Sequence, residues 1–328
     1  MKTPIVQVTS LSKNFSYPVP KQGKGWLSNL FFPERRTVQA VESISFAIHA
    51  GERVAFIGPN GAGKSTTIKM MTGILFPSEG EVRVLDMNPA TDRKKLAYHI
   101  GTVFGQRSQL LPNLPLTDSF EFFGVMYDLS SEDIRRRTKE LVQTFELGDF
   151  AQQPVRKLSL GQRMRAEVAA SLIHEPQIIF LDEPTIGLDV VAKKSLRDLL
   201  LRINQEKKTT IFLTSHDVGD IETLCDRTMV INHGKLIADM PTSELSKQFI
   251  SEKFISLVPK EHAETFPPLP EGLTYEETQP TQIIVRVDLA RWDVPSALTS
   301  LLGYFEAEDI DIYNADMESV IRHVYERT

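Results

Sequence analysis

One run of nine residues constrains this chain more than any other. Residues 58–66 read Gly-Pro-Asn-Gly-Ala-Gly-Lys-Ser-Thr and fit the pattern G-x-x-x-x-G-K-[ST]. The apolar run 54–57 precedes them, and residues 64–73 predict a helix. A strand, a glycine-rich turn and a helix in this order are typical of a loop that wraps a polyphosphate. Backbone N–H groups can approach the anion closely there, because glycine has no Cβ to block it.

The residue types of this loop fit the chemistry of a nucleoside triphosphate with magnesium. The helix N-terminus directs partial positive charge at the phosphates. Lys64 can reach the β- and γ-phosphates, and the Ser65 hydroxyl can bind Mg²⁺. The guanine-recognition sequences of GTPases, Asn-Lys-x-Asp and Thr-Lys-x-Asp, do not follow. The expected nucleotide-binding residues of the loop are Gly58, Pro59, Asn60, Gly61, Ala62, Gly63, Lys64, Ser65 and Thr66.

Strands and helices alternate through most of the chain. Residues 178–181 are all apolar, and the run 210–214 is apolar between two threonines, as in strands buried on both faces. Residues 190–206 and 217–224 predict helices after these two strands. Further helices are predicted at 130–148 and 162–174. The pattern predicts an α/β fold, with a mainly parallel sheet covered by helices on both faces.

Composition excludes several classes of protein. The 37 Lys and Arg against 43 Asp and Glu give a net charge of −6, which argues against a protein that coats nucleic acid. No apolar run approaches the ~18 residues that a membrane-spanning helix needs. No apolar leader is visible near the N-terminus. The single cysteine, Cys225, excludes an internal disulfide and is expected to be a small core residue.

Two regions depart from this alternation. Proline and glycine interrupt residues 17–37, and the apolar residues within them fall at helical spacing. We interpret 17–37 as an insertion in a first domain, residues 1–247. Prolines also punctuate residues 248–328, where 283–287 predict a strand and an apolar stripe predicts a closing helix. We expect a small α+β domain there.

Four further motifs follow the loop, in the order Leu158-Ser-Leu-Gly-Gln162, Ile178-Ile-Phe-Leu-Asp-Glu-Pro184, Gly187-Leu-Asp189 and Thr214-Ser-His216. Together with the loop, they resemble the ATP-binding cassette (ABC) transporter ATPases over about residues 4–245. The longer strings 155–167 and 182–191 are similar to sodium-exporter-like cassettes that accompany ABC-2-type permeases. The resemblance implies a P-loop NTPase cassette with an antiparallel β subdomain and a helical subdomain at about 107–175.

The acidic pair and the histidine fit ATP hydrolysis. Asp182 ends an apolar strand, where a carboxylate can hold Mg²⁺ through water. Glu183 can orient and deprotonate the attacking water, a role that contributes typically 10²–10⁴-fold. His216 follows the strand at 210–214, at the carboxyl edge of the sheet, where an imidazole can contact the γ-phosphate.

Two further positions depend on the family resemblance. In ABC cassettes, a glutamine after the strand near residue 104 contacts Mg²⁺ or the water and senses the permease. Counting from that strand favours Gln106, whereas counting back from Thr117 leaves Gln109 open. An aromatic ring is expected to stack on the adenine, and Phe15 is nearer the family position than Tyr17.

The signature Leu158–Gln162 is expected to act across a dimer. The family resemblance implies that Ser159, Gly161 and Gln162, with Asp189, meet the ATP held by a second cassette packed head-to-tail. Leu160 departs from the glycine usual at the middle of this motif.

The resemblance implies an ATPase subunit that uses ATP and Mg²⁺ and powers export through separate ABC-2-type permease subunits. It would lie at the cytoplasmic face of the membrane and dock through residues 110–123. The insertion either contacts the permease or membrane surface or folds onto its own cassette. One alternative is a soluble ABC ATPase acting on nucleic acid or ribosomes, but the chain lacks a long coiled-coil insertion and a second cassette. Another is an ATP-binding regulator without turnover, which the presence of Glu183 and His216 disfavours.

Overall fold

The computed structural model describes residues 3–19, 34–104, 108–215, 217–249, 252–260 and 266–314. The chain divides into two compact units, residues 1–242 and 243–328, which are described separately below. The division lies shortly before the predicted boundary at 247 and coincides with the start of helix α9 (Thr242–Phe249). Among the described residues, no helix is long and apolar enough to cross a membrane.

A six-stranded sheet forms the centre of the first unit, with strands in the order β5-β6-β7-β3-β8-β9. Neighbouring strands are parallel except at the edge, where β9 runs antiparallel to β8. The strands are β3 (Arg53–Ile57), β5 (Ile100–Phe104), β6 (Ile178–Asp182), β7 (Thr210–Thr214), β8 (Arg227–Asn232) and β9 (Lys235–Pro241). Strand β7 is buried at every residue and β6 at its first four, which confirms the prediction of a buried parallel sheet.

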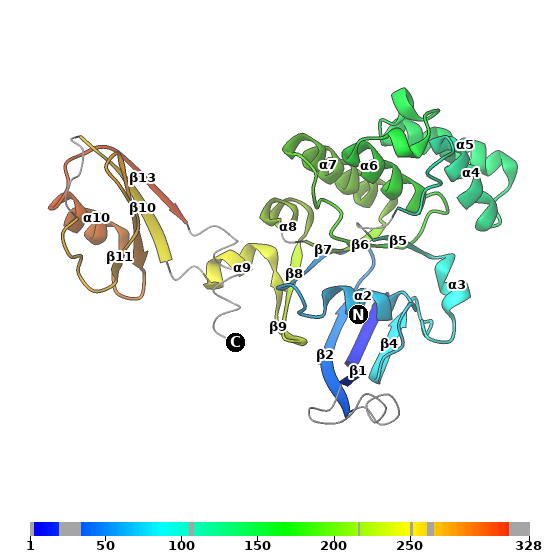
Figure 1. Ribbon diagram of the computed structural model, residues 1–328, viewed down its shortest axis with the longest axis horizontal. Helices are drawn as coiled ribbons and strands as arrows, with labels where there is room; N and C mark the ends of the chain where they lie inside the picture. The colour runs from blue at the N-terminus through cyan, green and yellow to red at the C-terminus, as the bar shows by residue number, and fades with distance from the viewer. Residues whose placement is uncertain are drawn as a thin grey trace. The chain divides into compact units, whose positions relative to one another are not determined.

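Helices lie on both sides of this sheet, as predicted. Helix α2 is on one side, together with a second sheet, and helices α4 to α8 are on the other (Figure 1). The helices of this unit are α2 (Lys64–Met71), α3 (Arg93–Ala97), α4 (Leu116–Met126), α5 (Ser131–Thr144), α6 (Leu160–Ser171), α7 (Val190–Lys207) and α8 (Val218–Leu224). Two short 3₁₀ turns, Gly148–Phe150 and Val155–Lys157, lead from α5 to α6.

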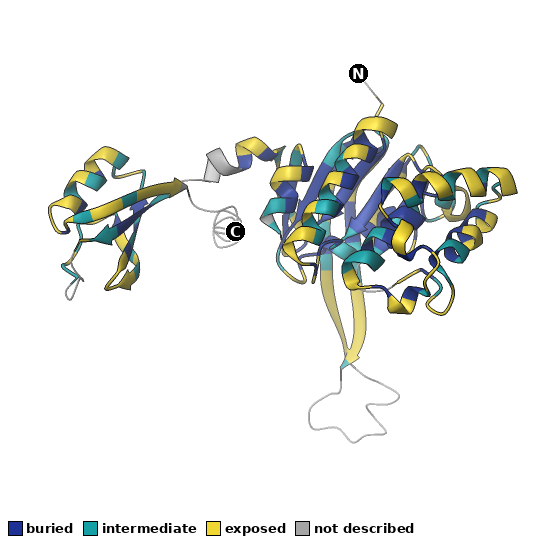
Figure 2. Ribbon diagram, turned by 90° about the horizontal axis from the view of Figure 1, so that it is seen from above, coloured by how far each residue is buried: buried dark blue, intermediate teal, exposed yellow. Residues whose placement is uncertain are grey.

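The second sheet is antiparallel, with the order β2-β1-β4. It consists of β1 (Val6–Val19), β2 (Glu34–Ile48) and β4 (Glu79–Val84). The outer halves of β1 and β2 pair only with each other, up to Val19 opposite Glu34. This two-stranded ribbon extends away from the body of the unit and is largely exposed (Figure 2).

The ribbon includes both edges of the expected insertion. Residues 17–19 belong to β1 and residues 34–37 to β2, so both edges of the segment 17–37 are strand. Cross-strand pairing of Val19 with Glu34 continues the hairpin past Pro18, a residue that edge strands tolerate. The helical spacing noted from Trp26 to Phe31 lies outside the described residues.

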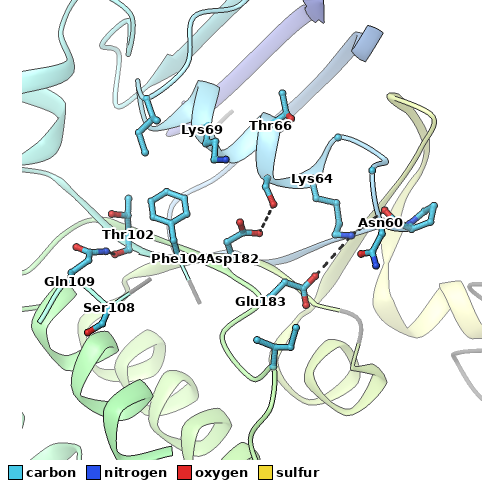
Figure 3. Close-up of a pocket in the computed structure, with 16 residues that line it drawn as sticks. Asn60, Lys64, Thr66, Lys69, Thr102, Phe104, Ser108, Gln109, Asp182 and Glu183 are labelled. Carbon is cyan, nitrogen blue, oxygen red and sulfur yellow. Dashed lines mark hydrogen bonds and ion pairs between the residues drawn. The ribbon is translucent and has the colours of Figure 1, made fainter. Parts of the chain in front are cut away.

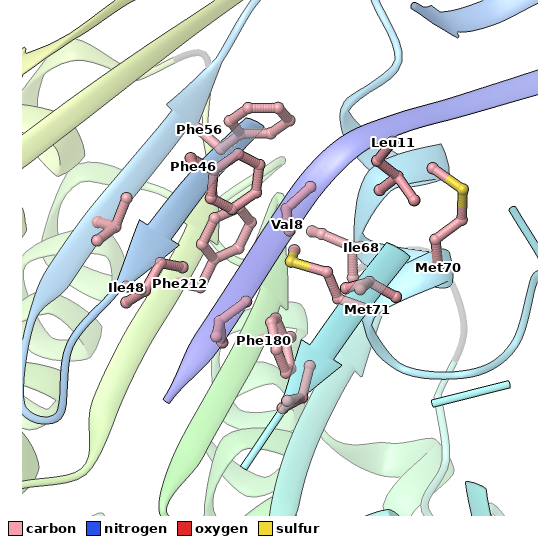
Figure 4. Close-up of a cluster of buried hydrophobic side chains, with 14 of the residues drawn as sticks. Val8, Leu11, Phe46, Ile48, Phe56, Ile68, Met70, Met71, Phe180 and Phe212 are labelled. Atoms are coloured by element: carbon pink, nitrogen blue, oxygen red, sulfur yellow. The ribbon is translucent and has the colours of Figure 1, made fainter. Parts of the chain in front are cut away.

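A cluster of aromatic and aliphatic side chains joins the two sheets and α2. Phe46 of the antiparallel sheet lies against Phe56 and Phe212 of the parallel sheet, with ring centroids 6.0 and 6.4 Å away. Ile68 and Met71 of α2 belong to the same cluster and lie beside Val8 (Figure 4). All of these side chains are buried, so the core fixes the direction in which α2 leaves the phosphate loop.

The second unit begins with α9 and continues as a four-stranded antiparallel sheet with a further described helix, consistent with the α+β prediction. The sheet has the order β11-β12-β10-β13. Its elements are β10 (Glu252–Pro259), β11 (Leu273–Gln279), β12 (Gln282–Asp288), α10 (Val294–Leu302) and β13 (Ala307–Asn314). Ala297 and Leu301 of α10 pack on Ile255 and Val285 of the sheet in a core of its own. The closing helix predicted from Met317 to Tyr325 lies outside the described residues.

Candidate active site

A polar cavity of about 880 Å³ opens at the carboxyl ends of β3, β5 and β6. Its walls come from the phosphate loop and α2, from the end of β5, from residues 108 and 109, and from residues 182, 183 and 186 (Figure 3). In open α/β sheets, ligands bind at this edge, because loops from several parallel strands converge there. The cavity therefore gathers the phosphate loop and the acidic pair, which the sequence separates by more than 110 residues.

Glycines allow the phosphate loop its close contacts. A Cβ on Gly58 would lie 2.2 Å from the carbonyl oxygen of Ile231, and one on Gly63 would lie 2.5 Å from that of Ala40. Gly63 also has a φ of 110°, which side chains other than glycine rarely adopt, and it caps the N-terminus of α2. The loop is therefore held between β8 and β2 at the N-terminus of α2, the end of a helix that favours an anion.

Lys64 is buried at the base of the loop. Its ammonium donates to the carbonyl oxygens of Gly58, at 2.6 Å, and Pro59, at 3.3 Å. A carboxylate oxygen of Glu183 lies 4.0 Å away. Burial lowers the pKa of Lys64, and the nearby carboxylates of Glu183 and Asp182 oppose that shift. The lysine charge is held at the point where the loop would meet phosphate oxygens.

Two hydroxyl groups converge on Asp182. Ser65 donates to Asp182 Oδ1 at 3.1 Å and Thr214 donates to the same oxygen at 2.7 Å. A carboxylate and a serine hydroxyl side by side form the oxygen donor set that Mg²⁺ prefers, with the remaining positions filled by water or phosphate. The residues present therefore fit a magnesium ion at this point of the cavity.

Glu183 is fixed by its backbone. Its φ is 55°, in the left-handed region, and its N–H donates to both the carbonyl and the hydroxyl oxygen of Thr214, at 3.2 and 3.1 Å. This turn directs the side chain into the cavity, toward Lys64 (Figure 3). A carboxylate in this position can act as a general base for a water molecule beside the triphosphate.

The signature turn does not contribute to the cavity as the described residues form it. Ser159 caps α6, accepting from Gln162 N–H at 3.2 Å, and the Gln162 side chain accepts from Ser159 N–H at 2.9 Å. Gly161 lies against α7, since a Cβ on it would be 2.9 Å from Ala192 Cβ. Asp189 caps α7 through a 2.8 Å bond from Ala192 N–H. The turn thus presents an exposed helix N-terminus outside the cavity of its own chain.

The aromatic candidates lie on the ribbon. Phe15 is 41% exposed and pairs across the strands with Val38, which is 46% exposed. The ammonium of Lys13 lies 5.3 Å from the centre of the Phe15 ring. Phe15 does not line the cavity, but Val38 is close in sequence to Ala40, whose carbonyl contacts the phosphate loop.

Two predicted residues, Gln106 and His216, lie outside the described residues. Gln109, the alternative to Gln106, lines the cavity and donates through its side-chain amide to the carbonyl of Thr102, at 2.8 Å. Cys225 is buried, and burial raises the pKa of its thiol. This agrees with the interpretation of Cys225 as a core residue.

Some polar residues around the site were not singled out in the sequence. Thr214 orients both acidic residues, although in the sequence it appeared only as part of Thr214-Ser-His216. The buried Asp220 accepts hydrogen bonds from Thr185 and Ser215 and so ties the segment after Glu183 to the end of β7. An acidic residue near a predicted helix start was the only signal for this role, and such residues are common.

Comparison with known proteins agrees with this geometry. The family model described as "ABC transporter" matches residues 41–186. The ABC transporter ATP-binding protein NatA of Bacillus subtilis is 32% identical over 210 residues, which cover 64% of this chain and 85% of that protein. This chain belongs to the ABC transporter ATP-binding proteins. It is therefore an ATPase, and ATP is its nucleotide.

Two further similarities extend the comparison. The daunorubicin/doxorubicin resistance ATP-binding protein DrrA of Streptomyces peucetius is 30% identical over 291 residues, covering 86% of each protein, so this ABC ATPase resembles DrrA beyond the cassette itself. A solved structure, the ATP-binding cassette MJ0796 as a dimer in a post-hydrolysis state bound to ADP and Pi, is 26% identical with a TM-score of 0.61. The alignment covers 72% of this chain and 98% of that one. The cassette fold predicted from the motifs is confirmed.

Proposed function

We propose that this ABC ATPase powers export through separate ABC-2-type permease subunits at the cytoplasmic face of a membrane. The observation that carries the ATPase site is the convergence of Lys64, Ser65, Asp182 and Glu183 on one cavity. The direction of transport is supported by relatives: DrrA is named for resistance to two drugs. Which substrate is carried depends on the permease.

The residues of the cavity have separate roles in ATP hydrolysis. The loop N–H groups and Lys64 bind and orient the β- and γ-phosphates. Ser65 and Asp182 would hold Mg²⁺, which would neutralise charge on the phosphates. Glu183 takes a proton from the attacking water, with His216 and Gln106 assigned to the γ-phosphate and the metal by resemblance. Catalysis then depends on position and charge, without a covalent enzyme intermediate.

The adenine is placed against the exposed face of the ribbon. Phe15 and Val38 form a cross-strand pair and offer one aromatic and one aliphatic surface near the loop. Adenine stacking on an aromatic ring buries apolar area on both partners and needs no specific hydrogen bond. This position also explains why a large aromatic side chain remains exposed.

A second cassette completes the site. Ser159 and Gly161 stand at a helix N-terminus that does not line the cavity of their own chain, which supports the proposal that they bind the γ-phosphate of an ATP held by another chain. The dimeric state of MJ0796 supports this arrangement. The exposed Leu160, Val190 and Val191, which are 38%, 78% and 79% exposed, lie at the same pair of helix starts and fit a protein contact.

Helix α4 supplies the proposed permease surface. Phe122, Val125 and Met126 are 50%, 62% and 48% exposed, and Leu114 just before the helix is 44% exposed. Apolar side chains gathered in this way mark protein interaction sites more often than isolated ones do. They overlap and extend the predicted docking segment 110–123.

Capture of the full chain from membranes tests the permease assignment. Tagged protein should retain integral membrane proteins of ABC-2 type, identified by mass spectrometry. Val125→Asp on α4 should reduce that capture, while Lys139→Asp, an exposed change on α5, should not. Equal capture by both variants would contradict the docking surface. ATPase activity without any associated membrane protein would favour a soluble role.

A further inference from the structure

A buried carboxylate links the signature helix to the wall of the cavity. Glu167 lies on α6, eight residues after the cap residue Ser159, and is only 6% exposed. Its carboxylate accepts the hydroxyl of Ser108. It also accepts the N–H of Gln109, at 3.1 and 3.2 Å from its two oxygens, and the backbone of Leu110. Three consecutive residues of the segment after β5 thus converge on one side chain.

A carboxylate at this buried position of α6 is unfavourable if its only role is to pack the helix. The neighbouring buried positions of α6 carry Ala166, Val168, Ala169 and Ala170. Burying a carboxylate is unfavourable unless hydrogen bonds replace its hydration. Burial raises the pKa of Glu167, and the bonds from the 108–110 segment and the charge of Arg163 oppose that rise. An apolar side chain would pack there without this cost, so the carboxylate serves the segment that donates to it.

The segment is held at a second point as well. The side-chain amide of Gln109 donates to the Thr102 carbonyl on β5, at 2.8 Å. Gln109 is therefore tied through its backbone to α6 and through its side chain to the parallel sheet. Both Ser108 and Gln109 line the cavity (Figure 3). Any displacement of α6 relative to β5 must move Gln109 or break one of these bonds.

We infer that Glu167 is a positioning residue: it fastens residues 108–110 to the signature helix, so that the cavity wall and the turn at Ser159 move together. The inference rests on the proposed role of that turn in binding a second chain's nucleotide. Through this link, engagement of the turn of one chain is transmitted to the wall of that chain's own cavity. Glu167 itself does not touch the reacting atoms.

Glu167→Gln in the full 328-residue chain tests the link. The amide keeps the size of the side chain but replaces one acceptor oxygen with donors, which cannot accept an N–H. We expect faster hydrogen exchange at the Gln109 and Leu110 amides. We also expect kcat for ATP to fall roughly tenfold to a hundredfold, since small displacements of positioned groups have effects of this size. The ATP dissociation constant should change less than about twofold, because the loop contacts remain.

Two further variants keep the test decisive. Ser108→Ala removes one donor and should lower kcat less, in the same direction, even if Glu167→Gln folds poorly. Glu175→Gln is a matched carboxylate-to-amide control, because Glu175 binds Lys207 and Arg137 outside the cavity. It should leave both kcat and exchange at residues 108–110 unchanged.

The outcomes separate this inference from the proposed function. Unchanged exchange in Glu167→Gln, or an equal loss of kcat in Glu175→Gln, would overturn the link. A fall in ATP affinity that accounts for the whole loss of activity would also overturn it, since the cavity wall would then act in binding alone. Absence of an ATP-dependent dimer of the Glu183→Gln chain would refute the proposed role of the signature turn, while the exchange experiment would still report on the link.

Discussion

The phosphate-binding cavity and the signature turn differ in how many of their groups contact other residues of the same chain. In the cavity, the side chains of Lys64, Ser65 and Asp182 all contact other residues of the chain. At the turn, Ser159 and Gln162 cap each other and the helix end stays exposed. One region is preorganised for phosphate chemistry, and the other offers a surface. The difference suggests that a single chain binds ATP but that two chains are needed to enclose it.

The largest expected effect concerns Glu183. Glu183→Gln removes the proposed base but keeps the size of the side chain and its backbone bonds to Thr214. ATP turnover should fall by about 10²–10⁴-fold, the range for loss of a positioned base. ATP binding should persist, and light scattering should show a dimer in excess ATP and Mg²⁺. Turnover at the unmodified rate would remove Glu183 from the mechanism.

Lys64→Ala should act on binding. The buried ammonium is lost from the base of the loop, so affinity for ATP should fall by at least roughly tenfold, as expected when a charge-assisted contact to phosphate is removed. Equilibrium titration with a fluorescent ATP analogue measures the change. Thermal unfolding without nucleotide provides the control for folding. Affinity equal to that of the unmodified chain would contradict the assignment of the cavity.

Changes at the signature turn should separate dimerisation from binding. In Gly161→Ala, the added Cβ meets Ala192 Cβ at 2.9 Å, so α6 and α7 must shift. We expect ATP-dependent dimerisation in the Glu183→Gln background to weaken about tenfold, while a single chain binds ATP as before, because one displaced phosphate contact is worth one to two kcal/mol. Ser159→Ala tests the same turn without a steric clash. Loss of monomer binding would show that the turn belongs to its own cavity.

Phe15→Ala should have the smallest effect. Loss of one stacking surface should weaken ATP binding by a few-fold to about tenfold, since aromatic pairs are worth ~0.5–1.5 kcal/mol beyond buried area. The affinity for GTP should fall to a similar degree, because stacking depends on the aromatic ring of the base more than on its substituents. Tyr17→Ala is the matched control further along the ribbon. A larger effect for Tyr17 than for Phe15 would exchange their roles.

Local patterns in the sequence were enough to predict the parallel sheet, its helices and the phosphate loop. Strands β6 and β7 have apolar centres, Ile178–Leu181 and Ile211–Leu213, and α2 follows directly from the loop. The link from Glu167 to residues 108–110 could not be predicted, because 58 residues separate Gln109 from Glu167 and no periodicity relates them. The outer strands of the ribbon could not be predicted for a related reason: cross-strand pairs such as Tyr17 with Arg36 leave no local signal beside prolines. The sequence therefore predicts which residues form the site. Contacts between segments distant in the sequence determine how those residues are connected.

The leucine in the middle of the signature has a practical consequence. Leu160 is 38% exposed, and one of its methyl carbons would lie 3.1 Å from a Cβ on Gly187. Where relatives with the usual glycine have no methyl group, this chain carries two at the first residue of α6. Isotope-labelled Leu160 methyl groups would give an NMR resonance at this point, and its chemical shift would report closure of the assembly without any chemical tag.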